Sequence, residues 1–271
     1  MTEPEATPSR AWRVFATYAA AVAGSFLTAS LAIEVLGAAH PDVPWTTLVR
    51  TLPGVLTVSL GTSVGLVLSL LLIVRLDPVR LRLLPGWETG PILAVMVVGL
   101  LALGQALESA TALLGLGERG SLELVRRALE QARGPELFAA VLVFGLGAGV
   151  AEEIFFRGYM QARLRERWSA PAAVLASGTA FAVLHVDVSG VHMVLALALA
   201  VYLGFVAEVS GSTLPAIVCH VVNNIVWTLQ TALGFGVLSR DANAIAVVAG
   251  VAVFVACVLW LRRATPGPTT A

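Results

Sequence analysis

The sequence predicts an all-α fold: a polytopic membrane helix bundle of about eight transmembrane helices with an intramembrane polar cavity. The 271 residues are 58% hydrophobic and 13% charged, with a mean hydropathy of +0.87, which is too apolar for a domain with a solvated surface. Long apolar runs alternate with shorter polar connections. Several of these runs contain ionisable side chains, which a membrane protein places toward its interior.

A bilayer core requires about 20 mostly apolar residues for each helical span. The first apolar run is too long for the core of a signal peptide, so we interpret it as a retained span. By this criterion the candidate spans are residues 12–38, 54–75, 91–116, 136–160, 170–187, 191–208, 213–235 and 243–261.

The connection at residues 117–135 combines apolar and charged side chains. Leu122, Val125 and Leu129 recur at intervals of three and four residues, which is typical of an amphipathic helix at the membrane interface. Residues 265–271 are expected to form a disordered tail. Because we find no internal repeat and no soluble domain, residues 1–271 are interpreted as a single integral membrane domain.

The charged residues indicate the orientation of the chain in the membrane and argue against a nucleic-acid partner. All basic residues are arginine and the net charge is zero, so nothing suggests a nucleic-acid surface. If the N-terminus is cytoplasmic, the cytoplasmic loops contain more arginine residues than the outer loops, as the positive-inside rule predicts. We therefore expect a multi-pass protein of the cell inner (plasma) membrane, embedded in the lipid bilayer, with both termini cytoplasmic.

The fourth apolar run ends in AEEIFFRGYM, with two glutamates and an arginine. An ionisable group at membrane depth costs about 2.5–3.5 kcal/mol on insertion scales, so each requires a partner or a function. Glu153 and Arg157 are four residues apart, the favourable helical spacing for an ion pair. Glu152 points about 100° away. The doublet therefore predicts a structural Glu153 and a catalytic Glu152. Solvation of both glutamates at the membrane boundary is the alternative.

Two further spans carry polar groups at a depth that matches Glu152. Antiparallel helices joined near Trp168 place His185 opposite Glu152, and His220 enters the same layer from a later helix. His220 and Asn224 share one face because they are four residues apart. A histidine that only packs within the bundle is the simpler interpretation for each residue alone, but their coincidence in one layer favours a site.

Other polar residues are expected to have lesser roles. Gln105 and Glu108 are interpreted as partners in interhelical hydrogen bonds. Asp187 and His192 flank a turn, and we expect both to be solvated.

These side chains are the parts of an amide hydrolase. Glu152 can accept a proton from water, His185 can help to hold that water, and His220 with Asn224 can stabilise an oxyanion. No serine or cysteine is placed as a nucleophile beside a base, so water is the expected nucleophile. Glu152, His185 and His220 are also acceptable ligands for a divalent metal such as zinc, although no HExxH motif is present. The residues permit a metal without requiring one.

Three ordered motifs carry a resemblance to a known family. The segments Glu152-Glu153-Ile-Phe-Phe-Arg157-Gly158, Phe181-Ala-Val-Leu-His185 and His220-Val-Val-Asn-Asn224 resemble the EExxxRG, FxxxH and HxxxN motifs of the CAAX protease and bacteriocin-processing (CPBP) family. This family includes the type II CAAX prenyl endopeptidases. The resemblance covers residues 136–235, the expected catalytic core, and implies an intramembrane protease.

The resemblance also implies roles for the motif residues. Glu152 and His185 would activate water, while His220 and Asn224 would form the oxyanion site. Glu153, Arg157 and Phe181 would support them. The family has been called metalloprotease, but its archaeal prenyl-protease member resembles a glutamate-dependent enzyme without a catalytic metal, so the favoured mechanism requires no cofactor.

The expected substrate is a membrane-associated protein or peptide, because bacterial relatives are associated with peptide maturation, bacteriocin self-immunity and membrane-protein processing. Two alternatives stay open. A non-catalytic CPBP-like immunity or scaffold protein would keep the polar layer for packing or partner binding. A proton-coupled transporter would use Glu152 and the histidines as a relay, but the repeated halves typical of such transporters are missing from the sequence. The substrate and the oligomeric state stay open as well.

Overall fold

The computed structural model describes residues 11–74, 77–117, 119–235 and 238–265, and within these ranges every regular element is helical. Seven helical segments in this part of the chain are long and apolar enough to cross a membrane, and one shorter apolar helix accompanies them. The predicted polytopic helix bundle is therefore confirmed. The spans are α1 (Ala11–Ala39), α3 (Leu52–Ile73), α4 (Gly90–Leu113), the segment Gly134–Arg165, α9 (Ala170–Leu184), α10 (Val191–Ser210), α11 (Leu214–Leu233) and α12 (Arg240–Ala264).

Two short helices lie between the spans. Helix α2 (Trp45–Leu48) precedes α3, and α5 (Gly120–Glu130) occupies the middle of the connection predicted to be amphipathic. The buried Leu129 of α5 packs with Leu52 and Ala140 in a small apolar core, so this helix is docked onto the bundle. Of the predicted tail at residues 265–271, all but the first residue lie outside the described part of the chain.

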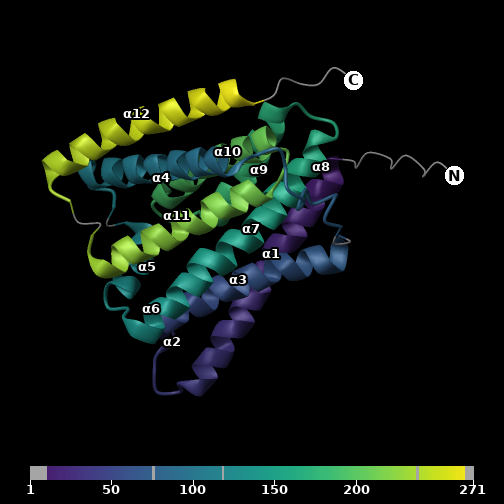
Figure 1. Cartoon of the computed structure of the whole chain (residues 1–271). Helices are drawn as coiled ribbons and strands as arrows, with labels where there is room; N and C mark the ends of the chain where they lie inside the picture. Colours follow the sequence, from purple (N-terminus) through teal and green to yellow (C-terminus); the bar gives the residue numbers. More distant parts are fainter. Residues whose placement is uncertain (1–10, 75–76, 118, 236–237, 266–271) are drawn as a thin grey trace.

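The spans are arranged as two outer helix pairs around an inner group. Helices α1 and α3 pack together on one side, and α4 packs against α12 on the other. The segment Gly134–Arg165 crosses the middle and contacts α11, while α9 packs against α10 (Figure 1). The residues of the three motifs therefore lie on adjacent inner helices, between the two outer pairs.

The pair α1–α3 is held by small residues. A Cβ atom added to Gly65 would lie 2.4 Å from the Cα of Ser25, and one added to Gly61 would lie 2.6 Å from the Cα of Ala29. The Thr28 hydroxyl lies 2.6 Å from the Gly61 carbonyl oxygen, to which it donates a hydrogen bond. This Gly-xxx-Gly contact is typical of helices that associate in a membrane, where close backbone packing replaces the hydrophobic effect.

The fourth span is not a uniform α-helix. Helix α6 (Gly134–Ala140) leads into the π-helical stretch η1 (Val141–Ala148), the short helix α7 (Gly149–Glu153), a second π-helical stretch η2 (Ile154–Gln161) and helix α8 (Ala162–Arg165). π-Helical turns are rare and occur frequently at functional sites. Both glutamates of the first motif lie between the two stretches, in α7.

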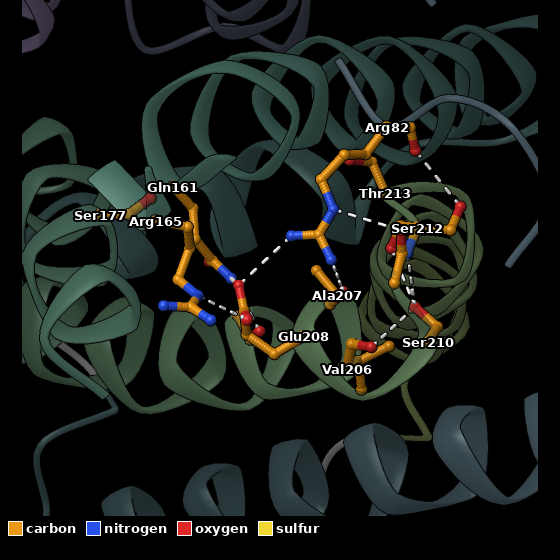
Figure 2. A network of polar contacts seen from close by, with 12 residues as sticks. Arg82, Gln161, Arg165, Ser177, Val206, Ala207, Glu208, Ser210, Ser212 and Thr213 are labelled. Carbon is orange, nitrogen blue, oxygen red and sulfur yellow. Dashed lines mark hydrogen bonds and ion pairs between the residues drawn. The ribbon is translucent and has the colours of Figure 1, made fainter. Parts of the chain in front are cut away.

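A polar network fastens one end of the bundle (Figure 2). Glu208 accepts hydrogen bonds from Arg82 at 3.3 Å, Gln161 at 2.9 Å and Arg165 at 2.9 Å. The backbone of Thr213 donates to the Arg82 carbonyl oxygen at 2.7 Å. The network thus links the connection before α4 to η2 and to the turn between α10 and α11, which fixes the positions of the helices that carry the motifs.

Candidate active site

Glu153 is the centre of a buried polar cluster. Its Oε1 atom accepts hydrogen bonds from Arg157 Nη1 at 2.9 Å and from His220 Nδ1 at 2.8 Å. Glu153 is 0% and Arg157 is 1% exposed, so this ion pair is fully removed from solvent. The predicted pair of Glu153 and Arg157 is present, and His220 is a further partner that helix spacing alone could not reveal.

Arg157 extends this cluster toward α10 and α9. Its Nη2 atom donates to the carbonyl oxygen of Ala200 at 2.9 Å. Its guanidinium carbon lies 5.0 Å from the centre of the Phe181 ring, a cation–π distance. Arg157 therefore joins three helical segments, and its buried charge has both an acid and a backbone acceptor.

Phe181 lies between the two histidines of the motifs. The centre of its ring is 4.6 Å from that of His185 and 5.9 Å from that of His220. Because Phe181 also contacts Arg157, it packs at once against three of the predicted site residues. The first residue of the FxxxH motif thus positions the others by ring packing.

Glu152 has a different environment from Glu153. Its Oε2 atom lies 3.8 Å from His220 Nε2, beyond hydrogen-bond distance, and its side chain lines a cavity. The two adjacent glutamates therefore differ in their environment, and their predicted roles stay a prediction. Glu153 is hydrogen-bonded to Arg157 and His220, whereas Glu152 lines the cavity in which a ligand would bind.

His185 directly follows α9, which ends at Leu184, three residues before the predicted end of that span. Its Nδ1 atom lies 3.0 Å from the carbonyl oxygen of Phe181. A carbonyl only accepts, so Nδ1 is the donor, and the neutral ring keeps a lone pair on Nε2. The span ends early because Asp187 accepts hydrogen bonds from the backbone N–H groups of Ser189 and Gly190, which builds a turn.

Asn224 is oriented by two neighbours. Its Nδ2 atom donates to the carbonyl oxygen of Phe144 at 3.0 Å, and its Oδ1 atom accepts from Asn223 Nδ2 at 3.4 Å. An amide nitrogen has two N–H groups, so one remains for a ligand. Asn223 also lines the cavity and was not singled out from the sequence.

A cavity of about 580 Å³ brings the predicted site residues together. One wall comes from α3 and α4, and residues of α5 also contribute to the lining. The side chains of Glu152, Phe181, His185, His220 and Asn224 all line it, as do many apolar residues. The predicted intramembrane polar cavity is therefore present, and most of its lining is apolar.

Two glycines bring the fourth span close to α11. A Cβ atom on Gly149 would lie 2.9 Å from Val221 Cγ2 and 3.2 Å from the Val221 nitrogen, and one on Gly145 would lie 2.5 Å from Ile225 Cγ1. This close approach places the glutamates within reach of His220. The four-residue spacing of the two glycines in an apolar segment was a signal in the sequence that the motif analysis did not use.

The prediction that Asp187 and His192 are solvated is wrong for His192. His192 lines the cavity, and its ring centre lies 4.8 Å from that of His185. Asp187 is partly buried and accepts hydrogen bonds from Ser121 of α5. The sequence placed both residues at a turn but could not show that α5 covers it.

The prediction of interhelical partners holds for one of two residues. Glu108 forms an ion pair with Arg126 of α5. Gln105 instead donates to Ser109, four residues later on its own helix, at 3.0 Å. Both side chains also line the cavity.

Residues 134–226 match the family model for the Rce1-like type II CAAX prenyl endopeptidases. The resemblance predicted from the three motifs is thus confirmed. No curated protein and no solved structure matches the chain. The match supports an intramembrane CAAX-type endopeptidase in general, and with the apolar helices it indicates a multi-pass membrane protein.

The Rce1-like segment contains all the predicted site residues, from Glu152 to Asn224. Within the described parts of the chain, no group of three or more His, Cys, Asp or Glu side chains is arranged to hold a metal ion. The possible metal ligands Glu152, His185 and His220 line one cavity but do not form such a group. The metalloprotease alternative therefore gains no support from the positions of these side chains.

Proposed function

We propose that this protein is an intramembrane endopeptidase that hydrolyses a peptide bond of a membrane-associated protein or peptide. The observation that carries the proposal is the convergence of Glu152, His185, His220 and Asn224 on one cavity, with Glu153 fixing His220 from behind. The family match supports the same class of activity.

In the proposed reaction, Glu152 and His185 activate the water. Glu152 faces the cavity without the direct ion pair that occupies Glu153, so its carboxylate can accept a proton from water. The Nε2 lone pair of His185 can accept a second hydrogen bond from the same water, because its Nδ1 atom is held by the Phe181 carbonyl. The two groups together orient the water and remove its proton.

In the proposed reaction, His220 and Asn224 stabilise the oxyanion. The free N–H of the Asn224 amide is one donor. His220 supplies the second from Nε2, and since its Nδ1 already donates to Glu153, His220 acts in this step as an imidazolium. Before water adds, the two carboxylates, the guanidinium of Arg157 and this imidazolium make a cluster without net charge.

The proposed reaction needs no covalent enzyme intermediate. Water adds to the carbonyl carbon while Glu152 takes one proton, and the carbonyl oxygen becomes the oxyanion held by His220 and Asn224. Collapse of this intermediate breaks the C–N bond, and Glu152 returns the proton to the leaving amine. The products are a new carboxyl terminus and a new amino terminus, and no metal or other cofactor takes part.

The apolar lining of the cavity fits an apolar or membrane-embedded substrate segment. We further propose that the protein lies in the plasma membrane with both termini in the cytoplasm, because the arginine distribution favours this orientation. An even number of crossings, the seven long spans and α9, would place both termini on one side.

The test is cleavage of a library of membrane-associated peptides by purified protein in nanodiscs, with and without a chelator. We expect cleavage by the wild type in both conditions, and its loss in Glu152→Ala and His220→Ala. Glu34→Gln, which alters an exposed carboxyl on α1, serves as the control. Sensitivity to the chelator would contradict the metal-free mechanism.

Equal behaviour of wild type and variants would contradict the proposed function. Specific binding of a protein or peptide without hydrolysis would then indicate the immunity or scaffold alternative. Uptake driven by a proton gradient and lost in Glu152→Ala would instead indicate a transporter.

A further inference from the structure

His192 lies in the catalytic cavity, although the proposed reaction assigns it no step. Its ring packs edge-to-face on the ring of His185, with centres 4.8 Å apart and planes at 73°. Phe181 packs on the same His185 ring, with centres 4.6 Å apart and planes at 32°. Two rings therefore restrict the rotation of His185, one from its own helix and one from α10.

His192 is itself held by a chain of hydrogen bonds. The Ser121 hydroxyl oxygen lies 2.8 Å from His192 Nδ1 and 2.8 Å from Asp187 Oδ2. The Ser121 backbone N–H also donates to Asp187 Oδ2 at 2.8 Å. Asp187 belongs to the turn before α10, and Ser121 belongs to the first turn of α5, so the chain links three parts of the structure.

The charge of Asp187 sets the direction of this chain. Asp187 accepts hydrogen bonds from the backbone N–H groups of Ser121, Ser189 and Gly190 and from the Ser189 hydroxyl, so both of its oxygen atoms act as acceptors. Asp187 is therefore a carboxylate, which only accepts, and the single Ser121 O–H donates to it. The remaining lone pair of Ser121 then accepts from His192 Nδ1, so Nδ1 carries the proton of the neutral ring.

The contact between α5 and this turn is close. A Cβ atom on Gly120 would lie 2.2 Å from Asp187 Oδ2, and the φ angle of Gly120 is 69°, in the region that favours glycine. Glycine at this position thus lets the first turn of α5 meet the carboxylate. Since Ser121 lines the cavity with later residues of α5, the hydrogen-bonded chain lies at the boundary between α5 and the histidines.

We propose that His192 is a positioning residue, which orients the His185 ring and makes that orientation depend on the docking of α5 through Ser121 and Asp187. The inference rests on the proposed peptidase function for its effect on catalysis. Its structural part, the protonated Nδ1 of His192 and the fixed ring of His185, is independent of that function.

The structural part is tested by ¹⁵N NMR of protein labelled at the histidine rings. The chain has four histidines, so the ring signals can be assigned by substitution. We expect wild-type His192 to carry its proton on Nδ1. Ser121→Ala should shift the His192 and His185 signals, and Ser121→Thr should restore them. Ser239→Ala should leave them unchanged, because the Ser239 hydroxyl caps α12 and does not line the cavity.

Kinetics test the consequence for catalysis. We expect Ser121→Ala and His192→Ala to lower kcat by roughly tenfold to a hundredfold with little change in KM, since misorientation of a catalytic group weakens the chemical step rather than binding. Ser121→Thr should recover most of the rate, and Ser239→Ala should match the wild type.

Two results would overturn the inference: identical His185 and His192 signals in Ser121→Ala and wild type, or a wild-type kcat in His192→Ala. If the wild-type protein cleaves no peptide, the proposed function fails, and the NMR spectra alone still decide whether Ser121 orients the two rings.

Discussion

His220 donates a hydrogen bond from Nδ1 to Glu153 Oε1 across 2.8 Å, joining α11 to the fourth span at the level of the cavity. The bond fixes the ring so that Nε2 is directed toward Glu152, at 3.8 Å. Adjacent glutamates thus contact the two nitrogens of one imidazole. Glu153 holds the ring in place, whereas Glu152 lines the cavity.

Replacement of Glu153 is expected to destabilise the fold. In Glu153→Ala, Arg157 keeps its buried charge without the acid that neutralises it, and His220 loses the acceptor of Nδ1. Removal of one partner from a buried pair typically costs about 3–5 kcal/mol. The free energy of unfolding in detergent measures this loss.

Glu123→Ala provides the matched control, because Glu123 and Arg127 also form an ion pair at a spacing of four residues, but Arg127 is 74% exposed. An exposed pair contributes about 0–1 kcal/mol. Equal losses of stability in the two variants would show that the Glu153 cluster does not hold the helices together.

The close approach at Gly149 is expected to be required for activity. A methyl group there meets Val221 at 2.9 Å and forces α11 away from α7, which lengthens the bond between Glu153 and His220. Overpacking of this kind costs about 1–3 kcal/mol. We expect Gly149→Ala to lower both the cleavage rate and the thermal stability.

Gly147→Ala is the control for this change, since the nearest atom to its added methyl group is the Leu142 carbonyl oxygen at 3.4 Å, an ordinary contact. Alanine also favours a helix over glycine. Retained activity in Gly149→Ala, or equal loss in both variants, would show that the packing of α7 on α11 does not govern the site.

The carboxylate of Asp187 is expected to make the docking of α5 sensitive to acid. The pKa of Asp187 in the folded protein lies below the unfolded value of about 3.9. Its contribution to the free energy of unfolding is therefore complete above about pH 3.9 and is lost as the pH falls through the folded pKa. Asp187→Asn should therefore be less stable than the wild type at pH 7, and the difference should shrink below about pH 4. Thermal unfolding of both proteins against pH measures it; a constant difference would contradict the assignment.

The sequence predicted most of the architecture because hydropathy determines where a chain crosses a bilayer. All eight expected spans correspond to helices, with ends that differ by a few residues. The fourth span differs most, because it continues to Arg165 instead of residue 160. Helix α9 ends three residues early, where Asp187 and Gly190 form a turn that hydropathy does not detect. The spacing of Glu153 and Arg157 likewise predicted their ion pair, because that contact is local to one helix.

Contacts between distant segments were harder to predict. Two such contacts are the hydrogen bond between Glu153 and His220 and the packing of His192 on His185. Each depends on the distance between two helices, which is set by glycines such as Gly149. The π-helical stretches η1 and η2 also change the direction of side chains from the 100° step assumed for an α-helix. Apolar periodicity contains neither kind of information.

The most direct measurement is the peptide cleavage rate of Glu152→Gln, read together with its thermal unfolding and beside Glu34→Gln. Loss of a general base lowers the rate by about 10²–10⁴-fold, and the amide keeps the shape of the side chain. We predict this loss for Glu152→Gln with unfolding like that of the wild type, and no loss for Glu34→Gln. A folded Glu152→Gln protein that cleaves at the wild-type rate would contradict the division of roles between the two glutamates.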